Sequence, residues 1–327
     1  MNEHNPIPIL CVVGPTASGK SGLAISLAKC LGGEIVSCDS MQIYRRMDIG
    51  TAKPTQEEQM LVRHHLIDVV EPDTPFSCAE YVAAASRVIA DISNRGAMPI
   101  VCGGTGLYLD ALLRGGGFEE TKTDPRLRES LFAFAEVHGN RALHERLRAV
   151  DPESADSIHE NNVKRVVRAL EIFESTGMTK TESDKRSRML ASPYRATVMG
   201  LRYEPRQILY DRIDRRVDEM LASGLCEETE RLLKEDVFEK NATAAQAIGY
   251  KELLGYFKGT KTLDASVEEL KRATRRYAKR QMTWFCARDY VRWMDMTDDG
   301  VPISHDRAVE RALKFIENRL ERKNQDV

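Results

Sequence analysis

The chain has 327 residues, enough for a sizeable hydrophobic core in one large domain or two modest ones. Its 48 basic and 50 acidic residues give a formal net charge of −2, so affinity for nucleic acid has to come from local clusters of charge. The seven cysteines are scattered without a C-x-x-C pair, which argues against a disulfide framework or a zinc knuckle and favours reduced thiols in the cytoplasm. The first ten residues lack a basic segment ahead of a long apolar run, so we expect neither a signal peptide nor a membrane span.

The first third of the chain alternates short apolar runs with amphipathic ones, the pattern of a parallel α/β sheet flanked by helices. Strands are predicted at 8–13, 34–39 and 98–102, with helices at 22–31 and 80–94. A further β-rich run at 196–201 returns to the sheet, and helices follow to about residue 235. A long last helix is predicted to begin with the capping box Ser266–Glu269 and to run to about residue 288.

The first predicted strand leads into GPTASGKS at 14–21, which fits the P-loop pattern G-x-x-x-x-G-K-[ST] and precedes a predicted helix. The glycines let successive backbone N–H groups converge on phosphate oxygens, and the start of a helix adds partial positive charge. Lys20 supplies a full charge, and the Ser21 hydroxyl is a ligand for Mg²⁺. We expect a polyphosphate or pyrophosphate here, against the alternative of a chance match in a Gly/Ser-rich turn. The predicted diphosphate-binding residues of the loop are Gly14, Thr16, Ala17, Ser18, Gly19, Lys20 and Ser21.

Ligands of parallel sheets gather at the carboxyl ends of strands, which draws attention to the loops after the second and third predicted strands. Asp39 closes the second strand, and we expect it to act as an outer ligand of the metal or as a general base. A turn or helix N-cap is the structural alternative. The third strand runs into Gly103-Gly104-Thr105-Gly106, where the Thr105 hydroxyl can reach a phosphate oxygen. A tight strand-to-helix turn would need the same glycines.

Residues 124–177 lack strand patterns, so we predict an all-helical insertion at 122–191 between the two parts of the core, 1–121 and 192–327. In the helix NVKRVVRALEIF the basic side chains lie opposite the apolar face; they are Lys164, Arg165 and Arg168. The last helix carries two basic rows beside the aromatic residues Tyr277, Trp284 and Phe285; the rows are Lys271, Arg275, Lys279 and Arg272, Arg276, Arg280. Polyanion contact and a solvated face are both open interpretations of these rows.

Two smaller features also carry charge. Arg212 and Arg216, four residues apart in DRIDRRVDEML, form a phosphate clamp or salt bridges with their neighbouring aspartates. His64 and His65 have no third ligand at metal spacing, so a structural role is expected.

Seven segments resemble, in the same order, those of the tRNA dimethylallyltransferases, the bacterial tRNA isopentenyltransferases. They are GPTASGKS, SCDSMQIYRRMDIGTAKPT, HHLIDVVEP, GGTGLYLDALL, NVKRVVRALEIF, AIGYKEL and KRQMTWF. The resemblance extends from about residue 8 to about residue 295, and DSMQIY with DIGTAKP is specific where a lone P-loop would not be. Two departures are Ser21, where many relatives have Thr, and Arg46, where Gly is common. The chain also lacks the Cys/His zinc element of eukaryotic relatives, which favours the bacterial type.

The resemblance implies an α/β fold with a P-loop NTPase-like core and a helical insertion. It implies transfer of a dimethylallyl group from dimethylallyl diphosphate to N6 of the adenosine just 3′ of a tRNA anticodon, with Mg²⁺ as cofactor, in a cytoplasmic monomer. By resemblance the catalytic residues are Asp39, Thr105 and Lys20, and Arg212 or Arg216 reaches the diphosphate. The residues that it assigns to the anticodon stem-loop are Asp39, Ser40, Met41, Gln42, Arg128, Lys164, Arg165, Val166, Val167, Arg168, Arg275, Arg276, Lys279, Arg280 and Gln281.

Three other functions fit part of the pattern. An adenylate isopentenyltransferase shares the P-loop and the prenyl donor, but a free nucleotide does not need the helical insertion or the basic rows. A P-loop kinase of a small metabolite fits the loop alone. An RNA-binding protein without activity fits the basic helices but not the donor-site loops.

Overall fold

The computed structural model describes residues 5–115, 124–189 and 191–325. The chain forms two compact units, one of residues 1–112 with 194–327 and one of residues 113–193. The predicted boundary between residues 121 and 122 lies outside the described residues. The second predicted boundary, between 191 and 192, lies close to the end of the second unit at Pro193.

The first unit is built on a six-stranded parallel sheet in the order β3-β2-β4-β1-β5-β6, which confirms the predicted α/β class. Its strands are β1 (Ile7–Val13), β2 (Gly33–Ser37), β3 (His64–His65), β4 (Met98–Gly103), β5 (Tyr194–Arg202) and β6 (Val291–Asp295). The central strand β1 is buried from Ile9 to Val13 because both faces of the sheet are covered. The predicted return to the sheet at 196–201 is confirmed, since β5 lies directly beside β1.

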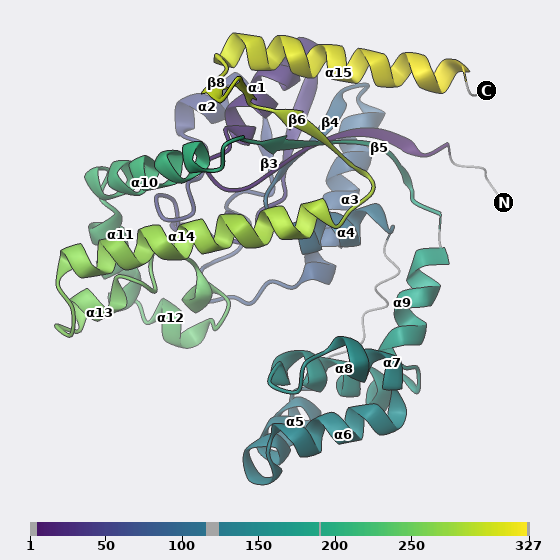
Figure 1. The fold of residues 1–327 in the computed structure, drawn as a ribbon, viewed down its shortest axis with the longest axis vertical. Helices are drawn as coiled ribbons and strands as arrows, with labels where there is room; N and C mark the ends of the chain where they lie inside the picture. The colour runs from purple at the N-terminus through teal and green to yellow at the C-terminus, as the bar shows by residue number, and fades with distance from the viewer. Residues whose placement is uncertain (1–4, 116–123, 190, 326–327) are drawn as a thin grey trace. The chain divides into compact units, whose positions relative to one another are not determined.

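Helices cover both faces of this sheet (Figure 1). On one face α1 (Lys20–Leu31) packs on the strands, and α15 (His305–Gln325) packs on α1; α3 (Cys78–Asn94) and α4 (Gly106–Leu113) follow on the other side. The start of α3 is fixed by a capping box between Ser77 and Glu80. The other elements of this unit are α2 (Gln56–Leu61), α10 (Gln207–Ala222), α11 (Leu225–Lys234), α12 (Val237–Lys240), η1 (Ala244–Gln246), α13 (Leu254–Phe257), α14 (Leu263–Cys286), β7 (Thr297–Asp298) and β8 (Val301–Pro302).

The prediction for the end of the chain was wrong in two respects. Helix α14 begins after Thr262, whose side chain accepts the backbone N–H of Ala265, so the predicted capping box at Ser266 does not start it. Ser266 instead lies fully buried inside the helix. Nor is α14 the last helix, because β6 and then α15 follow it.

The second unit is all-helical over its described residues, as predicted. Its helices are α5 (Pro125–His138), α6 (Asn140–Val150), α7 (Pro152–Ser157), α8 (Val163–Thr176) and α9 (Lys180–Met189). Asp124 caps α5 by accepting the backbone N–H groups of Arg126 and Leu127. The core of the unit is apolar; it includes Leu131, Leu143, Leu147, Val166, Val167 and Leu170. No helix in the described parts of the chain is long and apolar enough to cross a bilayer.

Candidate functional site

The phosphate loop connects β1 to α1 and has the backbone of an anion cradle. Ala17 and Gly19 adopt left-handed conformations, with φ of 61° and 84°, which curl the chain before the helix begins at Lys20. The backbone N–H groups of the first helical turn, including those of Lys20 and Ser21, have no acceptor within the helix and are available to an anion. Burial lowers the pKa of Lys20, and the neighbouring Arg216 charge lowers it further. The loop therefore places a buried cation beside free backbone donors, a combination that favours the binding of an anion.

Gln281 of α14 holds this loop in place. Its Oε1 accepts the backbone N–H of Thr16 at 2.8 Å, and its Nε2 donates to the carbonyl of Gly104 at 3.0 Å. A Cβ on Gly104 would lie 2.2 Å from that Nε2, so only glycine admits the bond. Gln281 is 5% exposed. Its predicted contact with tRNA stays a prediction, but both ends of its amide are engaged within the protein.

Asp39 lies in the loop after β2, beside the glycine turn that follows β4. Its Oδ1 accepts the backbone N–H of Met41 at 2.9 Å, which is the turn role considered as an alternative for this residue. Thr105 Oγ1 accepts the N–H of Ser40 at 3.0 Å and so ties the two loops together. A Cβ on Gly103 would lie 2.1 Å from the carbonyl oxygen of Cys38, because the loops touch there. The turn bond uses one carboxylate oxygen of Asp39, and the same side chain lines a cavity.

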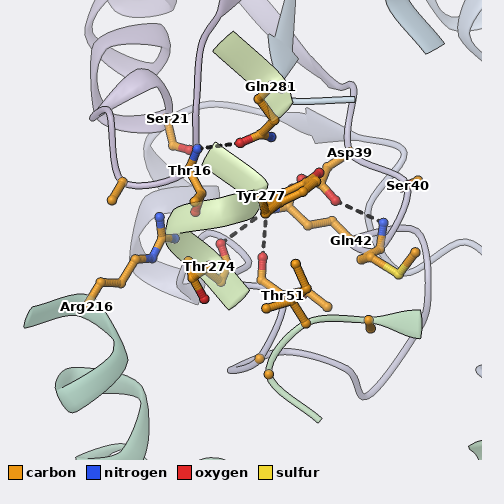
Figure 2. Close-up of a pocket in the computed structure, with 18 of the residues that line it drawn as sticks. Thr16, Ser21, Asp39, Ser40, Gln42, Thr51, Arg216, Thr274, Tyr277 and Gln281 are labelled. Carbon is orange, nitrogen blue, oxygen red and sulfur yellow. Dashed lines mark hydrogen bonds between the residues drawn. The ribbon is translucent and has the colours of Figure 1, made fainter. Parts of the chain in front are cut away.

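That cavity has a volume of about 350 Å³ and is enclosed by segments from across the first unit. Figure 2 shows Asp39, Ser21, Arg216 and Tyr277 around it. The predicted site residues that line it are Thr16, Ala17, Lys20, Ser21, Asp39, Ser40, Met41, Gln42, Arg216, Arg280 and Gln281. Burial raises the pKa of the Tyr277 hydroxyl, and the nearby Asp39 charge raises it further. The structure thus brings a carboxylate and the phosphate loop to one space.

A smaller pocket of about 270 Å³ reaches the same loop. Ala17, Lys20, Ser21 and Arg216 line both spaces. Gly19 and Arg212, also predicted to bind diphosphate, line only the smaller one. Three other predicted residues, Gly14, Ser18 and Thr105, line neither.

The two arginines of α10 are arranged differently from each other. Arg212 Nε donates to the carbonyl of Ala17 at 2.9 Å, and its guanidinium lies over the ring of Tyr203. Arg216 enters both cavities, where burial lowers its pKa, and in the described residues neither arginine forms an ion pair. The neighbouring aspartates bond to α14 instead: Asp214 to Arg275, and Asp218 to Lys271 at 2.7 Å. The salt-bridge interpretation therefore does not describe Arg212 and Arg216.

The basic residues of α14 divide between its two sides. Lys271 and Arg275 face α10, whereas Arg276, Lys279 and Arg280 are exposed. Arg276 and Arg280 line a third pocket, of about 420 Å³, together with Arg272 and Lys251. The exposed side of the helix is therefore the part that is available to a polyanion.

In α8 the exposed basic residues are Lys164 and Arg165, whereas Val166 and Val167 belong to the apolar core, at 0% and 1% exposure. These figures cover the whole residue, so the backbone of the two valines is buried as well as the side chains. Elsewhere in the unit, Arg128 and Arg168 each donate to Oε2 of the fully buried Glu171, at 2.8 Å. The predicted RNA contacts of this unit stay predictions.

Residue types and spacing did not reveal the groups that shape the rest of the cavity. Glu228 accepts the backbone N–H groups of Asp48, Ile49 and Gly50, each at 3.0 Å, and the hydroxyl of Tyr250 at 2.7 Å. This carboxylate fixes the DIGT segment, whose Gly50 lines the cavity. The segments DIGTAKP and AIGYKEL were signals of the resemblance, but Glu228 gave none, because it is one of several acidic residues on an amphipathic helix.

Gln42 is a second internal brace. Its Oε1 accepts the hydroxyl of Ser37 at 3.0 Å, and its Nε2 donates to the carbonyl of Ala52 at 3.1 Å. Its side chain thus joins the end of β2 to the loop that precedes α2.

Two other sequence features have structural explanations. His65 pairs with Glu34 at 2.7 Å, as expected for a structural role. His64 Nδ1 bonds the carbonyl of Val62, but His64 also lines the cavity. Over the residues that the structure describes, no group of three or more His, Cys, Asp or Glu side chains is placed to hold a metal ion. Arg46 has a φ of 61°, a conformation that favours glycine, which is the residue that the resemblance led us to expect there.

Comparisons with known proteins give the relatives of this chain. A family model described as IPP transferase matches residues 42–289. The chain is 47% identical to the tRNA dimethylallyltransferase of Thermoanaerobacter sp. (strain X514) over 96% of this chain and 99% of that protein. It is 46% identical to that of Bacillus subtilis (strain 168), over 96% and 98% of the two chains.

Solved structures show the same likeness. The full-length tRNA isopentenylpyrophosphate transferase of Bacillus halodurans matches with a TM-score of 0.71 and 43% identity, covering 97% of this chain and 98% of that one. A eukaryotic dimethylallyltransferase, solved acting on tRNA, matches with a TM-score of 0.79 and 28% identity, covering 95% and 80%. The chain therefore belongs to the IPP transferase family, as its resemblance to the tRNA dimethylallyltransferases predicted.

Proposed function

We propose that this protein transfers a dimethylallyl group from dimethylallyl diphosphate to N6 of the adenosine immediately 3′ of a tRNA anticodon. The observation that carries the proposal is that Asp39 and the phosphate-loop residues Lys20 and Ser21 line one cavity. A base acceptor and a diphosphate donor can then meet in one space. The activity in the names of its relatives supports the same reaction.

The chemistry follows from the acceptor. The lone pair of adenine N6 is delocalised into the ring, so N6 is a poor nucleophile until its proton is removed. In the reaction the N6–C1 bond forms, the C1–O bond of the donor breaks, and its electron pair leaves with the diphosphate. Asp39 takes the N6 proton as general base. The bond from the Met41 N–H to Oδ1 orients the carboxylate and leaves Oδ2 for this proton.

The leaving group gains charge as it departs, and the loop is arranged to stabilise that charge. Lys20 and Arg216 line the same space, and burial disfavours the charged form of both, as their lowered pKa values indicate. A diphosphate between them offsets their mutual repulsion. Arg216 is a better candidate than Arg212 for this contact, because Arg216 lines both cavities and Arg212 only the smaller one. Thr105 acts indirectly, through its bond to the Ser40 N–H.

The donor set also fits Mg²⁺. The Ser21 hydroxyl lines both cavities, and the described residues offer no all-protein cage of carboxylates. Mg²⁺ commonly takes one or two protein ligands together with phosphate oxygens and water. Ser21 would hold the ion with the diphosphate, and the bound ion would supply further neutralisation of the leaving group.

The RNA contacts and the cellular setting complete the proposal. Arg276, Lys279 and Arg280 supply the polyanion surface of α14, and Lys164 and Arg165 that of α8. We further propose a monomer in the cytoplasm. All seven cysteines lie within the described residues and are free, which supports a reducing compartment.

One assay tests the reaction against its alternatives. The protein is incubated with labelled dimethylallyl diphosphate, Mg²⁺ and either tRNA or AMP, with a parallel reaction containing ATP. We expect label in tRNA alone, located on the adenosine 3′ of the anticodon after nuclease digestion. Label in AMP would indicate an adenylate isopentenyltransferase, and phosphoryl transfer from ATP a kinase. Binding of tRNA without transfer would indicate an RNA-binding protein.

A further inference from the structure

Helix α10 presents a polar and then an apolar surface to the cavity that Asp39 lines. Ile213, Arg216, Val217 and Met220 line it, at the spacing of one helical face. Arg216 lies at the phosphate loop, and Val217 and Met220 come next along the helix. Ile213 and Val217 are 0% and 2% exposed, so the apolar part of this face excludes water.

The position of α10 along the loop is fixed by two bonds. Arg212 Nε donates to the carbonyl of Ala17 at 2.9 Å. Just before the helix, the hydroxyl of Tyr203 donates to the carbonyl of Ser18 at 3.2 Å. Because both bonds end on the phosphate loop, α10 cannot slide relative to a diphosphate bound there.

Helix α14 packs beside α10 and contributes Leu270 and Thr274 to the lining of the cavity. The pair of Lys271 with Asp218, at 2.7 Å, and the pair of Arg275 with Asp214 join this helix to α10. Gln281 joins the far end of α14 to the loop through the Thr16 N–H. The width of the apolar compartment is therefore set by bonds at several points, and the compartment cannot widen without breaking one of them.

The spacing of Arg216 and Met220 along α10 matches one isoprene unit. From Arg216 to Met220 the helix advances four residues, a rise of about 6 Å. In a dimethylallyl group three bonds separate the reacting carbon from a terminal methyl. At about 1.5 Å a bond along a zigzag, that chain reaches roughly 4 Å, and the radius of the methyl group fills the remaining space. A ten-carbon geranyl chain extended along the helix in the same direction would reach past the level of Met220.

We propose that Met220 is a specificity-determining residue that closes the prenyl pocket, so that the site accepts a five-carbon allylic diphosphate and excludes longer ones. This inference rests on the proposed function. Met220 is the last residue of α10 that lines the cavity, and its unbranched thioether is suited to closing an apolar pocket. Shortening this side chain leaves the loop, Asp39 and the helix anchors in place, because none of the bonds that hold them involves Met220.

The test compares Met220→Ala with the wild type, using dimethylallyl and geranyl diphosphate as alternative donors to tRNA. The ratio of kcat/KM for geranyl to that for dimethylallyl is expected to rise at least about tenfold, the effect of a change of methylene size or more in an apolar pocket. Leu221→Ala is the matched control, since Leu221 is the next residue on α10 and does not line the cavity. An unchanged ratio in Met220→Ala, or an equal rise in Leu221→Ala, would overturn the inference.

A second variant covers the possibility that Met220→Ala folds poorly. Met220→Phe shortens the pocket, so KM for dimethylallyl diphosphate is expected to rise about tenfold or more, while KM for tRNA stays at the wild-type value. An unchanged KM for the donor in a folded Met220→Phe protein would also overturn the inference. The proposed function fails separately, if the wild type transfers no dimethylallyl group to tRNA at all.

Discussion

The carboxamide oxygen of Gln281 accepts the backbone N–H of Thr16 at 2.8 Å. Helix α14, late in the chain, thus holds the phosphate loop, which lies close to the N-terminus of the chain. The same carboxamide donates to the carbonyl of Gly104. Two loops that belong to different parts of the sequence are thereby fixed relative to α14. Gln281 therefore lines the cavity and also holds two of its loops together.

Replacing Gln281 by alanine is expected to destabilise the fold and to raise KM for the donor. The change leaves the Thr16 N–H and the Gly104 carbonyl without partners, at a cost of about 1–3 kcal/mol for each buried group. Urea unfolding and donor kinetics measure the two effects, with the exposed Gln207→Ala as control. Normal stability combined with weaker tRNA binding would make Gln281 an RNA contact instead.

Asp39→Asn is expected to lower kcat by about 10²–10⁴-fold, the usual contribution of a general base. The asparagine oxygen can still accept the Met41 N–H, so the turn survives, but the amide cannot take a proton. Single-turnover transfer and tRNA binding are measured together, and tRNA affinity should stay near the wild-type value. Unchanged turnover would remove Asp39 from the mechanism.

Neighbouring arginines of α14 are expected to differ in their response to salt. Arg276 is exposed, whereas Arg275 pairs with Asp214 of α10. Arg276→Gln should weaken tRNA binding and reduce the slope of log K against log salt concentration by about 0.7–0.9 for one lost phosphate contact. Arg275→Gln, the matched control, should leave the slope unchanged. Equal slopes in all three proteins would return this face to ordinary solvated surface.

Glu34 is expected to contribute stability that depends on pH. Hydrogen bonds from Arg95, and then from His65, lower its pKa from 4.5 to about 2. Since the folded pKa lies below the ordinary value, the contribution is complete above about pH 4.5 and is lost as the pH falls toward 2. Glu34→Gln should therefore be less stable than the wild type at pH 7, and the difference should shrink in acid. Urea midpoints measured from pH 7 to pH 3 check this, and a difference independent of pH would contradict it.

The sequence predicted the elements whose signals are local. The buried strands β1 and β4 have continuous apolar runs. The phosphate loop has the spacing of glycine, lysine and serine that defines the P-loop pattern. It missed β6, because Arg292 and Asp295 interrupt the apolar pattern of a short strand at the edge of the sheet. It also misplaced the start of α14, since Ser266 with Glu269 matches a capping box as a string while Thr262 caps the helix in the fold.

For the site, the same division holds between local and distant signals. That Asp39 and the phosphate loop share a cavity follows from their places at the ends of parallel strands. The roles of Gln281 and Glu228 depend on helices that approach these loops only after folding, and no spacing within a short segment encodes that approach. The aspartates beside Arg212 and Arg216 show the same limit, because their partners lie on another helix.

Two pockets share Lys20, Ser21 and Arg216, and this arrangement affects how the products would leave the site. The smaller pocket is bordered by the exposed residues Gly19, Arg215 and Glu219 and so opens to solvent. Spent diphosphate would then have an exit that the modified nucleotide does not block. The two products could then leave in either order. Diphosphate added as an inhibitor would compete with the donor and would not displace the RNA.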